Sequence, residues 1–173
     1  YKPFFENITS MPKPVVGAIA GPAAGIGAAI AMSCDLRVMS DDSYILSVFS
    51  NIALVPDGGL SWYLPKFMGF AKAYEHAIEA KKISAQDCLK YGIANKVVSR
   101  DELETITLEW AHKLSKRSSQ SLNHTKRLMR ESLEVGYWKT FQNEAEIQNE
   151  LTVSDQNREA VKAFLEKREP NFD

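Results

Sequence analysis

A glycine-spaced turn after a short apolar run constrains the fold of this chain more than any other feature. The run Pro14–Ala20 has the length of a strand and is rich in β-branched residues, which predicts a buried strand. Gly21, Gly25 and Gly27 then cross a turn, and Ala28–Met32 has so little side-chain bulk that a helix can begin there and pack closely. The segment therefore predicts a strand–glycine turn–helix unit.

The start of this helix is expected to hold an anion. Backbone N–H groups in the first turn of a helix lack intrahelical partners and lie at the positive end of the helix dipole. Phosphates, carboxylates and enolates all suit such a position. The turn lacks the third glycine of the dinucleotide-binding motif, and no Lys-Ser/Thr pair follows it as in a P-loop. Both nucleotide interpretations are therefore disfavoured, whereas close helix–strand packing alone would also explain the small residues.

Composition excludes several other classes of protein. The chain has 173 residues, 45% of them hydrophobic and 25% charged, which is typical of one globular domain with a real core. A formal net charge of -1 argues against nucleic-acid binding. No apolar run approaches membrane-spanning length, so no membrane partner is expected and a cytoplasmic location is predicted. Cys34 and Cys88 lie far apart, without a CxxC motif or a histidine-rich partner set, so neither a disulfide nor a metal site is expected.

The rest of the pattern predicts a βαββ core and a helical tail. Asp35–Met39 and Ser43–Ser47 are predicted to be the second and third strands, and Lys96–Val98 a further short one. A helix is predicted over Phe70–Ala80, and the first dozen residues read as a helix or a connector. Val48–Gly59 is predicted to be a loop, and from Ser99 to the end the pattern is helical throughout. Residues 1–100 and 101–173 are therefore interpreted as the core and the helical region of one domain.

Two sequences predict helix starts by their capping residues. Ser84 is followed three positions later by Asp87, and Ser99 is followed three positions later by Glu102. In a capping box the first side chain accepts from the third backbone N–H, and the third side chain accepts from the first. Both segments are therefore expected to open helices.

The segment Lys13–Asp35 resembles the signature of the enoyl-CoA hydratase/isomerase family, the crotonases. The resemblance continues through Ile52–Gly59, Ile83–Asp87 with Tyr91–Ala94, and Ala163–Phe172, so it covers nearly the whole chain. The family's N-terminal part has no counterpart, and the chain is expected to be truncated there. The resemblance implies an α/β fold of crotonase type. In that fold, this chain would be the C-terminal part of a spiral of ββα turns, followed by a helical trimerisation region.

The resemblance also implies an oxyanion site at the glycine turn. In crotonases, two backbone N–H groups hold the thioester carbonyl of an acyl-CoA and the enolate that forms after α-proton removal. The middle residue of the turn supplies one donor, which is Ile26 here, and a side chain is tolerated there if φ stays negative. Removing one such donor commonly costs ~3 kcal/mol of barrier. The flanking residues expected to contact substrate are Ala24, Gly25 and Gly27.

The acid/base groups depart from the hydratase pattern. The two positions at which the resemblance places hydratase glutamates are Ala29 and Phe49 in this chain. Adding water to an enoyl double bond requires groups that hold and deprotonate the water, and neither side chain can do so. Hydratase activity is therefore not expected.

One carboxylate remains nearby, Asp57, in a Pro-Asp-Gly sequence that would also suit a simple turn. In some crotonase-type isomerases, including those of the phenylacetate-pathway type, an aspartate at this position moves a proton between the α and γ carbons. A single base suffices for that work. Flanking apolar residues are expected to desolvate Asp57 and suit it to proton transfer. These residues are Phe49, Leu54, Trp62 and Tyr63.

The sequence therefore predicts an enzyme that isomerises the double bond of an acyl-CoA, with Ile26 as oxyanion donor and Asp57 as acid/base. The alternatives are an enoyl-CoA hydratase by family assignment and a non-catalytic acyl-CoA-binding or scaffold subunit. A coenzyme A thioester is the expected substrate, no cofactor is expected, and fatty-acid β-oxidation is the predicted setting. The chain as given is expected to be inactive, since the second oxyanion donor would lie in the family's N-terminal part.

The resemblance extends to the tail and to assembly. It implies that Phe164 and Lys167 contribute to the coenzyme A pocket, where the lysine meets a nucleotide phosphate of a ligand bound in the neighbouring subunit. Phe49 and Trp62 are the other residues expected to contact substrate. A homotrimer, or a hexamer formed as a dimer of trimers, is predicted.

Overall fold

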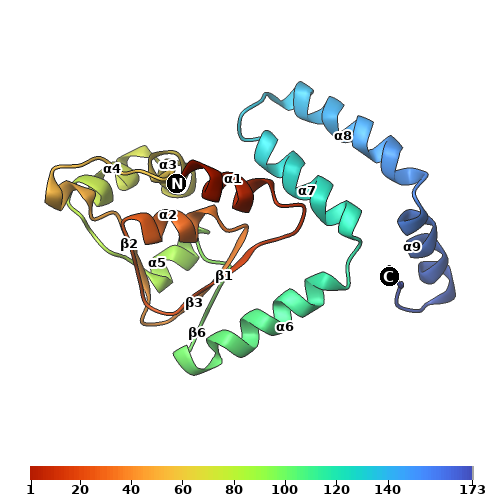
Figure 1. The fold of residues 1–173 in the computed structure, drawn as a ribbon, viewed down its shortest axis with the longest axis horizontal. Helices are drawn as coiled ribbons and strands as arrows, with labels where there is room; N and C mark the ends of the chain where they lie inside the picture. Colours follow the sequence, from red (N-terminus) through yellow and green to blue (C-terminus); the bar gives the residue numbers. More distant parts are fainter. Residues whose placement is uncertain (173) are drawn as a thin grey trace. The chain divides into compact units, whose positions relative to one another are not determined.

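The computed structural model describes residues 1–172, which form two compact units. Unit 1 contains Tyr1–Thr9 and Val15–Trp110, and unit 2 contains Ser10–Pro14 and the chain from Ala111 onward. Figure 1 shows the order of the elements along the chain. The division between the units falls inside the helix α6 (Leu103–Ser115).

The first sheet of unit 1 contains the strand predicted before the glycine turn. β1 (Val16–Ile19) pairs in parallel with β3 (Leu36–Ser40), and β3 pairs in parallel with β6 (Lys96–Val98). The strand order is β1-β3-β6. All three strands were predicted from their apolar runs, and their existence is confirmed.

The second sheet consists of the other three strands described in the unit. β2 (Pro22–Ala24) pairs in parallel with β4 (Tyr44–Leu46), which pairs antiparallel with β5 (Ile83–Ser84). The sequence predicted β4 but not β2 or β5, because strands of two or three residues carry no readable alternation. The predicted βαββ core is therefore divided between two sheets.

The helix α2 (Ile26–Ser33) lies at the centre of unit 1. Its composition is almost entirely small and apolar, and Ala28, Ala29 and Met32 are buried. Small side chains allow close approach, so α2 packs against β2 and against α3 (Leu60–Met68). Besides the first part of α6, unit 1 also holds the 3₁₀ turns η1 (Phe49–Ile52) and η2 (Arg100–Glu102), the helices α4 (Phe70–Ile78) and α5 (Ala85–Lys90), and all but the last residue of α1 (Lys2–Ser10).

The two predicted helix starts are both present, but their capping differs. Ser99 and Glu102 form the full capping box. At the other start, the Asp87 N–H donates to Ser84 Oγ, while the Ser84 hydroxyl itself donates to the Asp87 carboxylate at 2.6 Å. The second half of the box predicted there is not formed: the Asp87 side chain is one methylene shorter than that of Glu102, and its carboxylate meets the Ser84 hydroxyl and not the Ser84 N–H.

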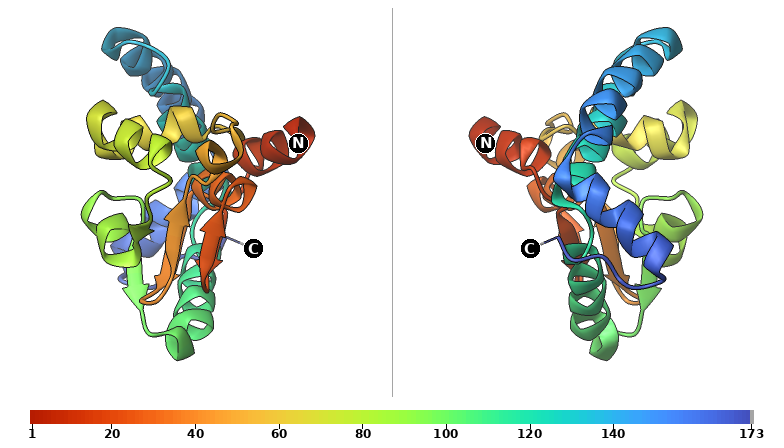
Figure 2. Two further views of the ribbon diagram at one scale, coloured as in Figure 1. Left: turned by 90° about the vertical axis from the view of Figure 1, so that its left-hand side faces the viewer. Right: turned by 90° about the vertical axis from the view of Figure 1, so that its right-hand side faces the viewer.

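Unit 2 is helical, as predicted. α7 (Ser119–Glu131) and α8 (Tyr137–Thr152) form an antiparallel pair, and α9 (Asp155–Glu166) follows (Figures 1 and 2). Ser118 and Ser154 cap the starts of α7 and α9 by accepting backbone N–H groups. In the part of the chain that the structure describes, no helix has the length and apolarity needed to span a membrane.

A buried arginine ties α2 to the first sheet. Arg37 lies on β3 and is only 4% exposed. Its Nη1 donates to the carbonyls of Met32, at 3.2 Å, and of Cys34, both at the C-terminal end of α2, while Nε donates to the Ile93 carbonyl. The guanidinium also lies 5.5 Å from the centre of the Phe67 ring. A cation at a helix C-terminus is favourable because it satisfies carbonyls that have no intrahelical donor.

Replacing Arg37 by Met is expected to lower the free energy of unfolding by about 3 kcal/mol, because several buried carbonyl groups lose a charged donor. Arg117→Met is the matched control, since Arg117 is exposed, and a change below about 0.5 kcal/mol is expected there. Urea unfolding followed by far-UV circular dichroism measures both values. Equal losses in the two variants would contradict the role assigned to Arg37.

Candidate active site

The glycine turn connects β2 directly to α2. Gly25 has φ 55° and ψ -125°, a conformation that favours glycine because a side chain would clash with the backbone. Its N–H donates to the Leu46 carbonyl at 3.0 Å, which extends the pairing of β2 with β4 up to the first residue of the helix. The helix start is thereby anchored to the second sheet.

The first amide of α2 belongs to Ile26, the predicted oxyanion donor. Intrahelical bonding begins with the N–H groups of Ala28 and Ala29, which both donate to the Gly25 carbonyl at 3.0 and 3.3 Å. The Ile26 and Gly27 amides precede them and are first-turn donors that the helix cannot satisfy. Ile26 is not among the described residues with positive φ, so the condition set for a side chain at this position is met.

Asp57 begins a tight turn that leads into α3. The Leu60 N–H donates to the Asp57 carbonyl at 3.1 Å, and the two residues between them, Gly58 and Gly59, have φ values of 59° and 91°. Two consecutive positive φ values define a turn that strongly favours glycine at both central positions. The turn interpretation of the Pro-Asp-Gly sequence is confirmed, and it does not conflict with a catalytic role for the side chain.

The turn rests on the first part of α2. A Cβ built on Gly58 would lie 2.5 Å from Ala29 Cβ, 3.2 Å from Ile26 Cδ1 and 3.0 Å from Phe5 Cζ of α1. These three residues therefore enclose the Gly58 backbone, and Asp57 lies next to the start of α2, where the oxyanion donor is predicted. Sequence reasoning missed Phe5 and this contact. The paired glycines after Asp57 were the available signal, but they do not reveal what the turn touches.

The two positions without glutamate lie at this same place. Ala29 is completely buried under Gly58. Phe49 is buried in η1, and its ring lies beside Gly25, with Cζ 3.8 Å from where a Cβ of that glycine would be. The structure thus brings Gly25, Ile26, Phe49 and the Asp57 turn together, and it places apolar groups where the resemblance puts hydratase carboxylates.

The predicted desolvation of Asp57 is not seen. Asp57 is exposed, and Leu54 is 59% exposed, so the described residues do not enclose the carboxylate. Trp62 and Tyr63 are half-buried on α3 and contact each other edge to face, with ring centres 4.8 Å apart. The prediction was wrong because apolar residues adjacent in sequence were assumed to cover the carboxylate, whereas Leu54 lines the groove beside the turn and Tyr63 packs against the core.

An apolar groove adjoins the Asp57 turn. It has a volume of about 360 Å³, and its walls come from the loop before the turn and from α3 and α4. Pro56, the residue before Asp57, is part of its lining. The other lining side chains include Leu54, Val55, Leu64, Phe70, Tyr74 and Ile78.

Phe164 and Lys167, the tail residues predicted to contact coenzyme A, lie in unit 2. Phe164 is 82% exposed on α9, and Lys167 ends that helix with φ 55°. The tail beyond them is held by Glu159, which accepts from Arg168 Nη1 at 2.6 Å and from the Asn171 N–H at 2.9 Å. The Arg168 guanidinium lowers the pKa of the Glu159 carboxyl to about 2, so this attachment persists through the neutral range.

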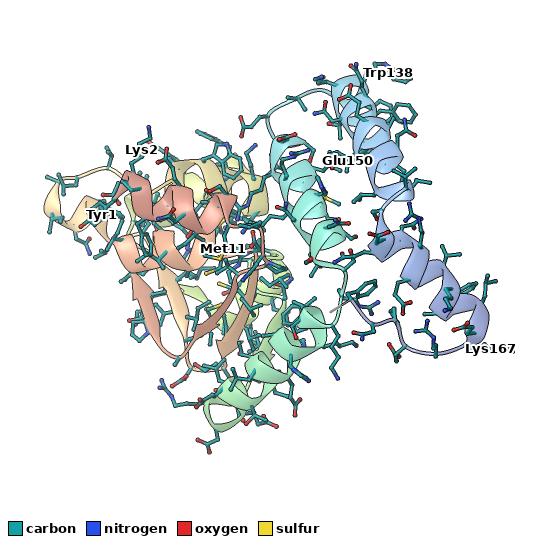
Figure 3. The ribbon with its side chains drawn as sticks, turned by 45° about the vertical axis from the view of Figure 1, so that its right-hand side comes forward. Tyr1, Lys2, Met11, Trp138, Glu150 and Lys167 are labelled. Carbon is teal, nitrogen blue, oxygen red and sulfur yellow. The ribbon has the colours of Figure 1, made fainter. Side chains whose placement is uncertain are left out.

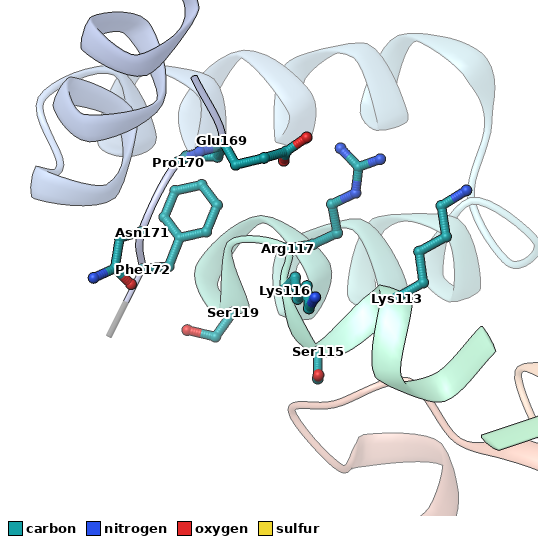
Figure 4. Close-up of a pocket in the computed structure, with 9 residues that line it drawn as sticks. All are labelled: Lys113, Ser115, Lys116, Arg117, Ser119, Glu169, Pro170, Asn171 and Phe172. Atoms are coloured by element: carbon teal, nitrogen blue, oxygen red, sulfur yellow. The ribbon is translucent and has the colours of Figure 1, made fainter. Parts of the chain in front are cut away.

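Unit 2 also contains an open basic pocket of about 680 Å³, shown in Figure 4. The tail faces the turn between α6 and α7 there. The α7 start is already capped, because the Ser121 N–H donates to Ser118 Oγ and the Gln120 N–H donates to Gln156 Oε1. The cationic side chains of the pocket are exposed, so we interpret it as a solvated basic surface. The lining residues are Lys113, Ser115, Lys116, Arg117, Ser119, Glu169, Pro170, Asn171 and Phe172.

Other chemistry-bearing residues do not join the site. Burial raises the pKa of the Cys88 thiol to about 12, so it stays protonated at neutral pH and is a poor nucleophile. His76 is buried, with Nδ1 3.2 Å from the Lys81 carbonyl, and serves packing. Among residues 1–172, no group of three or more His, Cys, Asp or Glu residues is placed to hold a metal ion.

Comparison with known proteins identifies the family. The family model described as "Enoyl-CoA hydratase/isomerase" matches residues 1–173. A "probable enoyl-CoA hydratase" of Rhodobacter capsulatus is 34% identical over 172 residues, which cover 99% of this chain and 67% of that protein. The trans-2-decenoyl-[acyl-carrier-protein] isomerase of Streptococcus mutans is 33% identical over 163 residues, covering 94% of this chain and 62% of that protein.

Solved structures show the same fold. A crystal structure of an enoyl-CoA hydratase from Polaromonas sp. JS666 superposes with a TM-score of 0.95 at 31% identity, over 98% of this chain and 66% of that one. The fold is of the crotonase type, and the chain belongs to the enoyl-CoA hydratase/isomerase family. It spans about two thirds of the length of these relatives.

Proposed function

We propose that this protein isomerises the double bond of an acyl-CoA, with the Ile26 N–H as an oxyanion donor and Asp57 as the acid/base. One observation carries the proposal: the Asp57 turn rests against the start of α2, while the two hydratase glutamate positions hold Ala29 and Phe49. In this proposal the carboxylate comes from the turn and not from α2 or η1.

The chemistry requires one base that works twice. The Asp57 carboxylate removes a proton from the α carbon of a 3-enoyl thioester, and the electron pair moves onto the carbonyl oxygen to give a dienolate. The Ile26 N–H stabilises this oxyanion, since a preorganised donor acts on charge as it forms. Asp57 then returns the same proton to the γ carbon, which yields the 2-enoyl thioester with no net change in atoms. The resemblance assigns the second donor to the family's N-terminal part.

The groove beside the turn supports a substrate with an apolar acyl group, the part of the molecule in which the double bond shifts. Its lining is dominated by aliphatic and aromatic side chains, and Pro56 joins it directly to Asp57. Coenzyme A contacts by Phe164 and Lys167 are part of the same proposal, as is cytoplasmic action in fatty-acid metabolism without an added cofactor.

Replacing Asp57 by Asn is expected to lower kcat for conversion of a 3-enoyl-CoA to a 2-enoyl-CoA by about 10²–10⁴-fold, since the amide cannot accept the proton. Acyl-CoA binding should change little, because the amide has nearly the same shape. The assay follows formation of the conjugated enoyl absorbance in the full-length enzyme. Asp101→Asn is the control, because Asp101 is exposed in η2. Near wild-type turnover by Asp57→Asn would contradict the mechanism, whereas acyl-CoA binding without any wild-type turnover would favour the non-catalytic alternative.

Hydration of crotonyl-CoA is expected to be at least about 100-fold slower than isomerisation, because neither Ala29 nor Phe49 can hold or deprotonate water. Loss of the conjugated absorbance measures it under the same conditions. Rapid hydration would show that other groups position the water and would favour the hydratase alternative.

We also propose that the protein assembles as a trimer, or as a pair of trimers, through its helical region. Three aromatic side chains at the start of α8 support this, since Trp138 is 78% exposed and contacts Tyr137 and Phe141 with ring centres 5.1 and 6.1 Å away. Figure 3 labels Trp138 at this end of α8. Exposed aromatic clusters are typical of interface centres.

Light scattering is therefore expected to give three or six times the mass of one chain. Trp138→Asp should shift the protein to smaller species, because it places a charge in the centre of the interface. Tyr1→Asp is the control, since Tyr1 is also an exposed aromatic residue but lies outside α8. A monodisperse monomer for the wild type would refute the assembly.

A further inference from the structure

The strongest unexplained feature of unit 1 is the lack of space between Ala29 and Gly58. A Cβ on Gly58 would lie 2.5 Å from the Ala29 Cβ, closer than Cβ atoms approach other heavy atoms in real structures. The contact therefore admits only a hydrogen on one side and a methyl group on the other. Close packing of this kind transmits a change of a single methylene to the neighbouring backbone.

The constraint acts in both directions. Ala29 has no exposed surface, so a larger side chain at this position cannot turn outward into solvent. It would have to displace a neighbour, and the turn at Gly58 already touches the Ala29 methyl group. The conformation of this turn is defined by the positive φ angles of Gly58 and Gly59 and by the hydrogen bond from Leu60 to Asp57. A turn held this way moves as a unit, and Asp57 moves with it.

The same contact also involves the oxyanion donor. Ile26 Cδ1 would lie 3.2 Å from a Cβ on Gly58, so the residue whose N–H meets the oxyanion also touches the turn that carries the base. Phe5 closes the third side at 3.0 Å, but its ring edge is the end of a side chain that can rotate. Ala29 Cβ is attached directly to the helix backbone and cannot yield in that way.

We propose that Ala29 is a positioning residue: its methyl group, fitted against Gly58, sets the distance between Asp57 and the oxyanion donor. This inference rests on the isomerase function proposed above. It adds that the small side chain at position 29 is itself required for the reaction. Its role then goes beyond the lack of a hydratase glutamate.

A double-mutant cycle tests the contact in the full-length enzyme. Gly58→Ala is expected to lower isomerase kcat by about 100-fold with KM changed less than about threefold, because a displacement of about 1 Å between reacting groups costs that much. Adding Ala29→Gly removes the opposing methyl group, and the double variant is expected to regain at least about tenfold in kcat. Ala29→Gly alone completes the cycle.

Gly92→Ala controls for backbone strain. Gly92 has φ 74°, but a Cβ there would meet nothing within 4 Å, and it lies far along the chain from the site residues. Its isomerase kcat should stay near wild type, and adding Ala29→Gly to it should give no gain. A loss in Gly92→Ala as large as that in Gly58→Ala would show that strain alone is responsible and would overturn the proposal.

Ala29→Glu tests whether a larger side chain at position 29 disturbs the site. It is expected to lose isomerase turnover by at least about 100-fold without gaining crotonyl-CoA hydration. Thermal melting of each variant reports the Ala29–Gly58 coupling without any activity, so the contact is measured even if the enzyme has another substrate. An inactive wild type overturns the isomerase function. An active wild type in which Ala29→Gly fails to rescue Gly58→Ala overturns the positioning role alone.

Discussion

The absence of side-chain bulk at three positions is the constraint on which the rest of unit 1 depends. Gly25 turns the chain from β2 into α2 with a backbone conformation that favours glycine. Ala29 and Gly58 then allow the turn before α3 to lie directly on α2. A larger residue at position 58 would separate the Asp57 turn from the helix start. The catalytic arrangement that we propose is a consequence of this close packing.

Polar interactions then fix the orientation of α2. The N-terminal end of α2 is tied to β4 through the bond from Gly25 to Leu46, and its C-terminal end is tied to β3 through Arg37. Because each tie comes from a different sheet, α2 joins the two sheets of unit 1. The two ends of α2 also differ in their backbone groups. Carbonyls at the C-terminal end accept from a cation, while the first amides at the N-terminal end remain available to an anion.

Apolar substitution at the site changes which reactions the fold can support. Phe49 packs beside Gly25 and Ala29 lies under Gly58, so neither position can hold water. Proton transfer within one substrate needs only a base on a turn and a donor for the oxyanion. The relatives of this chain include both hydratases and isomerases by name.

The sequence by itself determined the strand–glycine turn–helix unit, β1, β3, β4 and β6, the helical tail, and the residues at the helix start and in the Asp57 turn. These follow from local causes: apolar periodicity, capping residues and glycines that allow positive φ. Tertiary structure decided that the strands belong to two sheets, that Asp57 is exposed, and that Phe5 and Ala29 enclose Gly58. Residues distant in the chain make those contacts, and a local pattern carries no information about which distant residue occupies the space beside it.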